Sequence, residues 1–281
     1  MSNPKKHSFS RISTFSEICE RRGAFDSLIP REWDSAPIKR GNHVHDMLER
    51  MALLMIEGDT AVQAAEAVAE SKLCTEGYLK PNVAANYLQR AVPVFEHLKP
   101  RKEGVEAWFR DVSGLPIVGK IDLISETTPL VDPSGYVIGS VDKLCILDHK
   151  TIGNPARMKG TYEAKKSLQL KIYCLATGAR NAGFIYYLPT GAVRVVVVEF
   201  TEAELDIART WLDLTLKTIN RRWEEAAALS GRETGAPEVE GFNLLPFSLA
   251  EPGHPLCNAK FCDHWDRCLG RKADNSSSDK D

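Results

Sequence analysis

The sequence has no hydrophobic run long enough to span a membrane, and residues 1–22 contain no apolar core of signal-peptide length. We therefore expect a soluble, intracellular (cytoplasmic) protein with no membrane partner. The sequence also has no internal repeat, and its 43% hydrophobic and 26% charged residues are ordinary values for a globular protein. These features exclude a fibrous repeat and a largely disordered chain.

An excess of one charge is also missing, because 36 Lys and Arg residues face 38 Asp and Glu residues. The net charge of −2 gives no indication of nucleic-acid binding, but it averages over patches that act locally. One such patch lies between Lys150 and Arg180, where seven residues are basic and one, Glu163, is acidic. We expect an anion to bind along this segment.

Cysteines are few but unevenly placed. Three of the seven lie singly in apolar surroundings and are expected to pack as small core residues: Cys74, Cys145 and Cys174. Three more lie near the carboxyl end in a C-x4-C-x5-C pattern: Cys257, Cys262 and Cys268. In a reducing compartment such a cluster more often binds a metal than forms disulfides.

The hydrophobic pattern predicts helices first and then a mixture of strands and helices. One helix is expected to begin near residue 42. Four more are expected over residues 60–73, 82–98, 162–178 and 202–229. Expected strands cover residues 104–112, 115–125, 143–151, 182–189 and 192–200, the first two forming a hairpin. Residues 126–142 contain two Pro and two Gly and are expected to form a loop or a small excursion. This order predicts an α/β fold with a mixed central sheet flanked by helices.

We expect one domain over residues 1–268. It comprises a helical part at about 42–100, a core at about 103–229 and a Cys-rich segment at 254–268. The polar residues 269–281 are expected to be a disordered tail.

The segment CILDHKT places charged residues at the end of an apolar strand. Asp148 and Lys150 are two residues apart, so their side chains share one face of the strand. An ion pair at a strand end would account for these two residues alone. Asp122, in the segment GKID, adds a second carboxylate on a neighbouring strand, or it faces water at the strand end. Two such carboxylates repel each other unless a cation lies between them, and their oxygen atoms suit Mg²⁺ or Mn²⁺.

Two helical segments add polar side chains to this set. Gln169 and Tyr173 are four residues apart and therefore lie on one face of a helix, which is also typical of a partly exposed polar stripe. His45 lies one turn into another helix, where it is either a structural residue or a metal ligand.

Together, the segments GNHVH, GKID, DHK and QLKIY resemble the RecB-like branch of the PD-(D/E)XK nucleases. The pattern of that branch is a helical His, then G-x-x-D, then D/E-x-K, then Q-x-x-x-Y. The segment SFSRISTFSEICERR is similar to the lead-in of members that carry an iron-sulfur cluster. The first gap in the terminal Cys triplet is four residues here instead of two, and Glu20 replaces a frequent Pro.

This resemblance implies a restriction-endonuclease-like core and a metal-dependent DNA exonuclease that acts in recombination, repair or end processing. It implies that His45, Asp122 and Asp148 hold Mg²⁺ or Mn²⁺, with the backbone carbonyl of His149 as a further ligand. Lys150 would then meet the attacking water or the scissile phosphate. The residues that the resemblance implies along the DNA path are Gln169, Tyr173, Lys159, Lys165, Lys166 and Lys171. Glu106 is an open candidate for another carboxylate at the site.

The resemblance also implies a [4Fe-4S] cluster held by Cys19, Cys257, Cys262 and Cys268. A zinc site is the alternative, in which His254 or His264 replaces Cys19. DNA is the expected partner, and a recombination or replication protein is a further candidate. Alternatives for the activity are a non-catalytic DNA-binding protein with the same fold and a restriction-type endonuclease.

Overall fold

The protein is described from a computed structural model, which covers residues 7–29, 35–188, 191–232, 234, 236–250, 262 and 264–268. Its contacts divide the chain into two compact units. Unit 1 comprises Met1–Glu32, Leu115–Val118 and Thr210–Asp281, and unit 2 comprises Trp33–Gly114 and Gly119–Arg209. Each unit is described by itself below.

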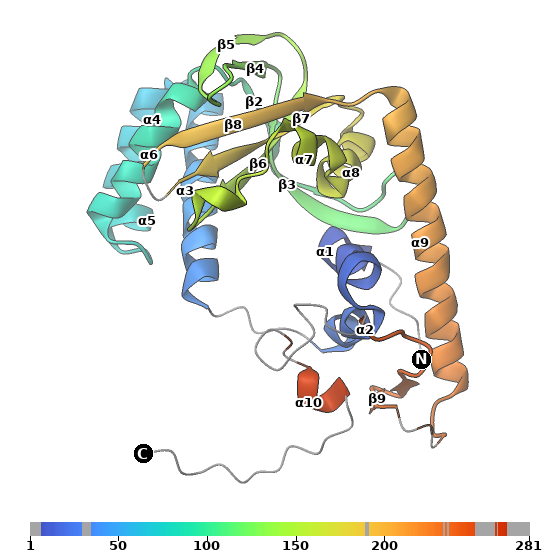
Figure 1. The fold of residues 1–281 in the computed structure, drawn as a ribbon. Helices are drawn as coiled ribbons and strands as arrows, with labels where there is room; N and C mark the ends of the chain where they lie inside the picture. Colours follow the sequence, from blue (N-terminus) through green and yellow to red (C-terminus); the bar gives the residue numbers. More distant parts are fainter. Residues whose placement is uncertain are drawn as a thin grey trace, which may run out of the picture. The chain divides into compact units, whose positions relative to one another are not determined.

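The helical part of unit 2 contains α3 (Ala36–Glu57), α4 (Ala61–Glu70), α5 (Lys72–Thr75) and α6 (Pro81–Phe95) (Figure 1). Helix α3 begins six residues before the expected start at residue 42, because Pro37 in its first turn is pre-organised for a helix. Helix α6 continues through Pro93 and ends two residues later, at Phe95.

The central sheet of unit 2 has the strand order β2-β3-β6-β7-β8. These strands are β2 (Pro100–Phe109), β3 (Ile117–Ser125), β6 (Cys145–Thr151), β7 (Asn181–Tyr187) and β8 (Val193–Glu199). Strands β6 and β7 are parallel, and the other neighbours are antiparallel. Helices lie against this sheet, so the predicted mixed α/β fold is confirmed, as is the hairpin of β2 and β3.

Residues 126–142 form a hairpin and not an irregular loop. Its strands are β4 (Thr128–Val131) and β5 (Val137–Val141). The Asp132 carboxylate accepts hydrogen bonds from the backbone N–H groups of Ser134 and Tyr136, and Gly135 takes a positive φ of 86°. The side-chain cap and the glycine close the turn that the Pro and Gly content indicated.

The helix expected over residues 162–178 is two helices, α7 (Thr161–Lys166) and α8 (Leu168–Thr177). Ser167 separates them, because its extended backbone ends α7 while its hydroxyl caps α8 at Leu170. A short 3₁₀ helix (Pro155–Arg157) precedes them, and α9 (Glu202–Ala228) follows β8 close to the expected bounds.

The core of unit 2 joins the helices to the sheet. Met47, Leu48 and Met51 of α3 pack in the same buried cluster as Leu123, Leu147 and Ile185 of the central strands. This cluster fixes α3 beside the middle of the sheet.

Unit 1 contains β1 (His7–Ser8), α1 (Phe9–Ser13), a π-helix (Thr14–Ile18), α2 (Glu20–Leu28), most of α9, the short strands β9 (Glu238–Val239) and β10 (Phe242–Asn243), and α10 (Trp265–Cys268). Strand β1 pairs in parallel with β3 at Ile117 and Val118. The buried core of unit 1 includes Phe25, Trp223 and Phe247. In the described part of the chain, no helix is long and apolar enough to cross a membrane.

Candidate functional site

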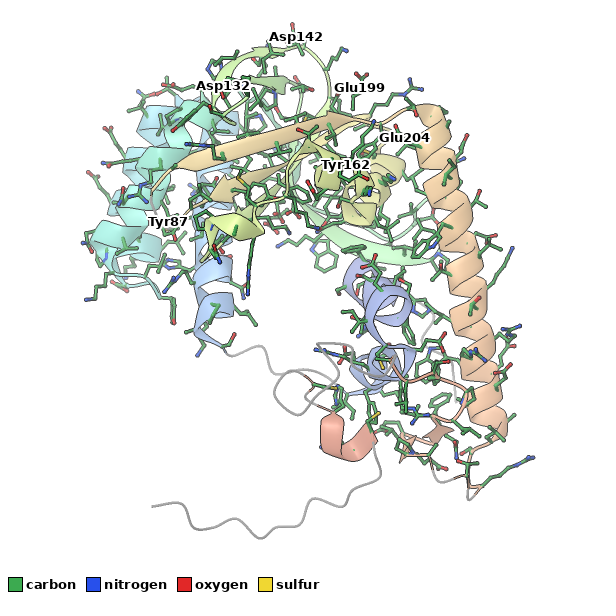
Figure 2. The ribbon with its side chains drawn as sticks, in the orientation of Figure 1. Tyr87, Asp132, Asp142, Tyr162, Glu199 and Glu204 are labelled. Atoms are coloured by element: carbon green, nitrogen blue, oxygen red, sulfur yellow. The ribbon has the colours of Figure 1, made fainter. Side chains whose placement is uncertain are left out.

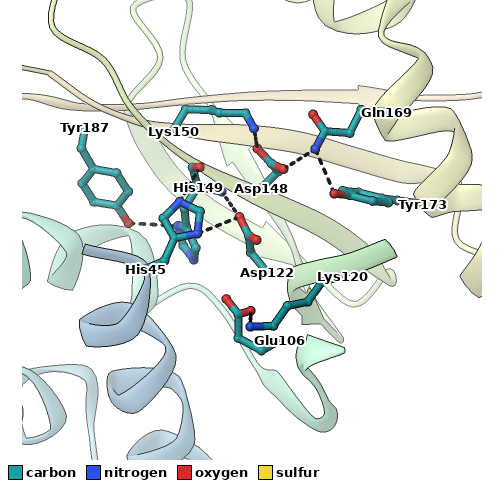
Figure 3. Close-up of polar contacts among 10 residues, drawn as sticks. All are labelled: His45, Glu106, Lys120, Asp122, Asp148, His149, Lys150, Gln169, Tyr173 and Tyr187. Carbon is teal, nitrogen blue, oxygen red and sulfur yellow. Dashed lines mark hydrogen bonds and ion pairs between the residues drawn. The ribbon is translucent and has the colours of Figure 1, made fainter. Parts of the chain in front are cut away.

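The segment CILDHKT is strand β6, which lies between β3 and β7 in the sheet. Its first four residues are buried, and Asp148 is only 2% exposed. Lys150 lies on the same face as Asp148, and its Nζ is 2.5 Å from the Asp148 Oδ2 (Figure 3). The predicted shared face of Asp148 and Lys150 is confirmed.

Asp122 lies on β3, which pairs with β6 through Leu123 and Leu147. The two carboxylates therefore occupy neighbouring strands where they leave the paired region. The Asp122 Oδ2 accepts a hydrogen bond of 2.8 Å from the backbone N–H of His149. This bond fixes the Asp122 side chain against β6.

His45 reaches the same place from α3. Its Nε2 lies 3.0 Å from the carbonyl oxygen of His149, and its Nδ1 lies 3.6 Å from Asp122 Oδ2. Because a carbonyl only accepts hydrogen bonds, Nε2 carries a hydrogen and Nδ1 faces the carboxylates. The His149 carbonyl, expected as a metal ligand, is a hydrogen-bond acceptor for His45 here.

Glu106 lies on β2 and completes a compact group with two of these residues. Ligating atoms of His45, Glu106 and Asp122 all lie within 4.8 Å of one another. The Glu106 backbone has a φ of 50°, a left-handed value that is rare for a residue other than glycine. Its carboxylate forms an ion pair with Lys120 of β3 (Figure 3). The structure thus places the open candidate Glu106 at the site.

The carboxylates differ in how readily they lose a proton. Burial raises the pKa of Asp148 to about 6, although the charge of Lys150 opposes the increase. Burial also opposes ionisation of Asp122, but His45 and the His149 N–H outweigh it and hold the pKa of Asp122 below its ordinary value. Burial raises the pKa of Glu106 despite the bond to Lys120.

His45 responds to the same charges. Burial by itself would lower the pKa of His45, but Asp122 outweighs it and raises that pKa above its ordinary value. The carboxylates around His45 therefore make its imidazole easier to protonate than an exposed histidine.

Gln169 and Tyr173, on α8, converge on Asp148. The Gln169 side-chain amide donates hydrogen bonds of 2.9 Å to Asp148 Oδ1 and to the Tyr173 hydroxyl. The predicted common face of these two residues is confirmed, and it is turned toward the carboxylates (Figure 3).

The residues fit a divalent cation. Among the described residues, His45, Glu106 and Asp122 are the one group of three His, Cys, Asp or Glu side chains with ligating atoms this close together. Asp148, one strand away, adds a carboxylate that resists ionisation while no further positive charge is present. Carboxylate oxygens and one imidazole are ligands for Mg²⁺ or Mn²⁺.

The basic residues near the site have partners of their own. Lys165 forms an ion pair of 2.8 Å with Glu204 at the start of α9, where Figure 2 places that side chain. Lys159, Lys166 and Lys171 lie over the rings of Phe184, Tyr162 and Phe200, respectively. The phosphate contacts expected for these lysines stay predictions.

Three of the four cysteines expected to form a cluster are described, and all three lie in unit 1. Cys19 caps α2, where its sulfur accepts from the N–H of Arg22. Burial raises the pKa of Cys268, Arg21 opposes the increase, and Cys19 and Cys262 lie near enough to add to it. Cys257 lies outside the described residues.

The other Cys and His predictions have different outcomes. Cys74, Cys145 and Cys174 are fully buried, which confirms their packing role. His264 stacks on Phe25, and its Nε2 is hydrogen-bonded to Asp26 Oδ1 at 2.9 Å. His254, like the tail at 269–281, lies outside the described residues.

Sequence reasoning missed the ion pair of Lys120 with Glu106. The spacing in GKID could have indicated this ion pair, since Lys120 and Asp122 are two residues apart on a strand and therefore share a face.

The sequence analysis also gave no role to His43, the other histidine of GNHVH. His43 is buried, and its ring bonds to the carbonyl of Leu73 and accepts from the N–H of Leu79, so its role is structural.

Comparison with known proteins gives one family and several solved structures. The family model of the PD-(D/E)XK nuclease superfamily matches residues 6–268. A protein from Eubacterium rectale described as a putative exonuclease is 14% identical, with a TM-score of 0.41 over 78% of this chain and 81% of that one. LHK-Exo in complex with dAMP is 13% identical, with a TM-score of 0.39 over 80% and 95% of the two chains. A search among curated proteins gives no match.

Proposed function

The chain belongs to the PD-(D/E)XK nuclease superfamily, and from this we propose that it is a Mg²⁺- or Mn²⁺-dependent DNA exonuclease acting in recombination, repair or end processing. The observation that carries the proposal is the convergence of Asp122, Asp148 and Lys150 on one place in the central sheet, beside His45 and Glu106.

In this proposal His45, Glu106, Asp122 and Asp148 hold the divalent cation. Bound there, the ion would supply a Lewis acid for the phosphate and a water molecule of lowered pKa. The His149 carbonyl keeps the hydrogen of His45 on Nε2, so the Nδ1 lone pair is available on the side of the carboxylates. The His149 N–H holds Asp122 in place from the same peptide segment.

Lys150 would act on the phosphate. Its ammonium group is partly exposed and pairs with Asp148 in this structure. From this position on the site face of β6, Lys150 would meet the scissile phosphate and stabilise the charge that develops on it in the transition state. Gln169 keeps Asp148 in position, because its amide bonds to Asp148 Oδ1 and is itself anchored to Tyr173.

We also propose that Cys19, Cys257, Cys262 and Cys268 bind a [4Fe-4S] cluster. Cys19, Cys262 and Cys268 lie in the same compact unit, and both Cys19 and Cys262 raise the pKa of the Cys268 thiol, which supports a shared site. Four thiolates are the usual ligand set of such a cluster.

The rival functions make different predictions. A non-catalytic DNA-binding protein would not need the set Asp122, Asp148 and Lys150, which is intact and converges. A restriction-type endonuclease would cut circular DNA as well as linear DNA.

The test compares linear DNA, labelled at either the 5′ or the 3′ end, with covalently closed circular DNA of the same sequence. We expect Mg²⁺ or Mn²⁺ to support stepwise loss of nucleotides from the linear DNA, and EDTA to stop it, while the circle stays intact. Cutting of the circle would replace the exonuclease with an endonuclease. DNA binding without cleavage under any of these conditions would favour the non-catalytic rival.

A further inference from the structure

Strand β2 carries two neighbouring aromatic residues in opposite environments. Phe109 lies over Gly119, where a Cβ atom would come within 2.3 Å of its ring, and it makes an edge contact with Tyr173. Trp108 points to the other face of the strand and is 70% exposed. Exposing an indole to this extent forgoes the burial of a large apolar surface, so packing in unit 2 does not explain Trp108.

The strand register places Trp108 beside the candidate cation site. Trp108 is paired with Lys120 across β2 and β3, so their side chains stand next to each other on one face. The Lys120 ammonium reaches Glu106, which belongs to the group with His45 and Asp122. Glu106 precedes Trp108 by two residues, a distance of about 7 Å along a strand.

Trp108 and Lys120 together match the chemistry of an unpaired nucleotide. An indole ring stacks on the face of a nucleobase, and a lysine ammonium attracts the phosphate that adjoins it. Inside a duplex both faces of a base are covered by the neighbouring base pairs, so an internal base must be unpaired to stack on a protein ring. The distance of about 7 Å from Glu106 puts such a base next to the scissile phosphate.

We propose that Trp108 is a stacking platform for an unpaired base of the DNA strand being cut, and that Lys120 holds its phosphate. The proposal rests on the proposed nuclease function and deepens it, because it makes a single-stranded segment or a frayed end the preferred substrate. A protein surface is the other possible occupant of an exposed indole, and the test below separates the two.

The test measures the binding of two fluorescent probes of equal length by anisotropy, in the presence of Mg²⁺. One probe is a single-stranded oligonucleotide, and the other has the same phosphates but only abasic sites. All proteins carry Lys150→Ala to keep the probes intact. Trp108→Ala should weaken binding of the base-containing probe about tenfold and leave the abasic probe unaffected.

Two variants define the chemistry of the contact. Trp108→Phe keeps an aromatic ring and should bind like the parent, whereas Trp108→Leu should bind like Trp108→Ala. Ile138→Ala is the matched control, because Ile138 is 68% exposed on β5 in the same unit and should affect neither probe. Thermal unfolding of each variant should match the parent, since both residues are exposed.

Equal binding of the base-containing probe by Trp108→Ala and its parent would overturn the stacking platform and indicate a protein partner for the ring. An equal loss on both probes would also overturn it, because the effect would not depend on bases. A parent that binds neither probe would also overturn the single-stranded preference, whereas the nuclease function itself is tested separately by the degradation of linear DNA by the unmodified protein.

Discussion

Asp148 and Asp122 lie on neighbouring strands, yet their environments set opposite protonation preferences. Asp122 receives the His149 N–H and faces His45, so its carboxylate is stabilised. Asp148 is buried, and its pKa of about 6 lies well above the 3.8 of an exposed Asp. A cation bound between the two would supply a positive charge that stabilises the ionised Asp148 carboxylate. Cation binding and deprotonation of Asp148 should therefore be linked.

This linkage predicts that the affinity for Mn²⁺ falls as the pH is lowered through about 6. The sign follows from the raised pKa: below it Asp148 holds a proton, and a neutral carboxyl group is a poor ligand. The raised pKa of Glu106 acts in the same direction. Calorimetric titration between pH 5 and pH 7.5 should therefore show weaker binding and greater proton release at the acidic end.

Asp148→Asn is the control for this titration. It should bind Mn²⁺ more weakly than the unmodified protein at pH 7.5 and show a smaller pH dependence, because only the contributions of Glu106 and His45 remain. An affinity that stays constant from pH 5 to pH 7.5 in the unmodified protein would mean that Asp148 is not a ligand.

At the scale of elements, the start of α9 depends on a capping box. The Thr201 hydroxyl accepts from the N–H of Glu204, and the Glu204 carboxylate accepts from the N–H of Thr201 and from Lys165. The bond to Lys165 and the Thr201 N–H lower the pKa of Glu204 to about 2. The box holds the helix that follows the last strand of the sheet.

Glu204→Ala should lower the free energy of unfolding by about 1 kcal/mol at pH 7. The folded pKa lies below the ordinary 4.5, so this contribution is present above pH 4.5 and is lost as the pH falls toward 2. Urea unfolding of the variant and the unmodified protein at pH 7 and pH 3 measures both effects. A difference that persists undiminished at pH 3 would assign the loss to packing and not to the charged cap.

The elements that were predicted from the sequence are those with strong periodicity. Strands β6, β7 and β8 are apolar runs, and in α9 apolar residues recur at helical intervals over a long segment. Their bounds were therefore predicted within a few residues. The break at Ser167 was missed because the pattern of apolar residues continues across it, while the interruption is a local cap. Residues 126–142 were expected to form a loop or a small excursion, and the β4 and β5 hairpin was not specified because its strands are only four and five residues long.

Several residues of the candidate site could also be predicted, because the spacing of residues in a strand or helix determines which side chains share a face. His45, Asp122, Asp148 and Gln169 belong to segments whose spacing fixes their side of a strand or helix, and the structure brings all four together. Glu106 stayed open because its position depends on a left-handed backbone that no local pattern signals. The pairing of Trp108 with Lys120 depends on the register of two strands, which the sequence alone does not specify.

At the scale of the whole molecule, the proposed cluster would tie residue 19 to residues 257–268 and so close a loop of most of the chain. Removing such a link restores conformational entropy to the unfolded chain. Anaerobically purified protein should therefore be brown, and Cys268→Ser should bleach it and lower the unfolding temperature. Cys174→Ala is the control and should keep the colour, since Cys174 is buried in unit 2.

Metal analysis of the same samples identifies the bound element. The cluster predicts about four iron atoms per chain. A colourless protein that contains one zinc and no iron would refute the cluster and leave the nuclease assignment unaffected.

Lys150 provides the most direct test of the central claim, that this site hydrolyses DNA. The measurement is the rate at which nucleotides are released from end-labelled DNA in Mg²⁺ by the unmodified protein, Lys150→Ala and Lys143→Ala. Lys143 is the matched control, because it is an exposed lysine just before the same strand. We predict that Lys150→Ala lowers the rate on the order of 10²-fold or more while Lys143→Ala has no effect. Equal rates for Lys150→Ala and the unmodified protein would contradict the account.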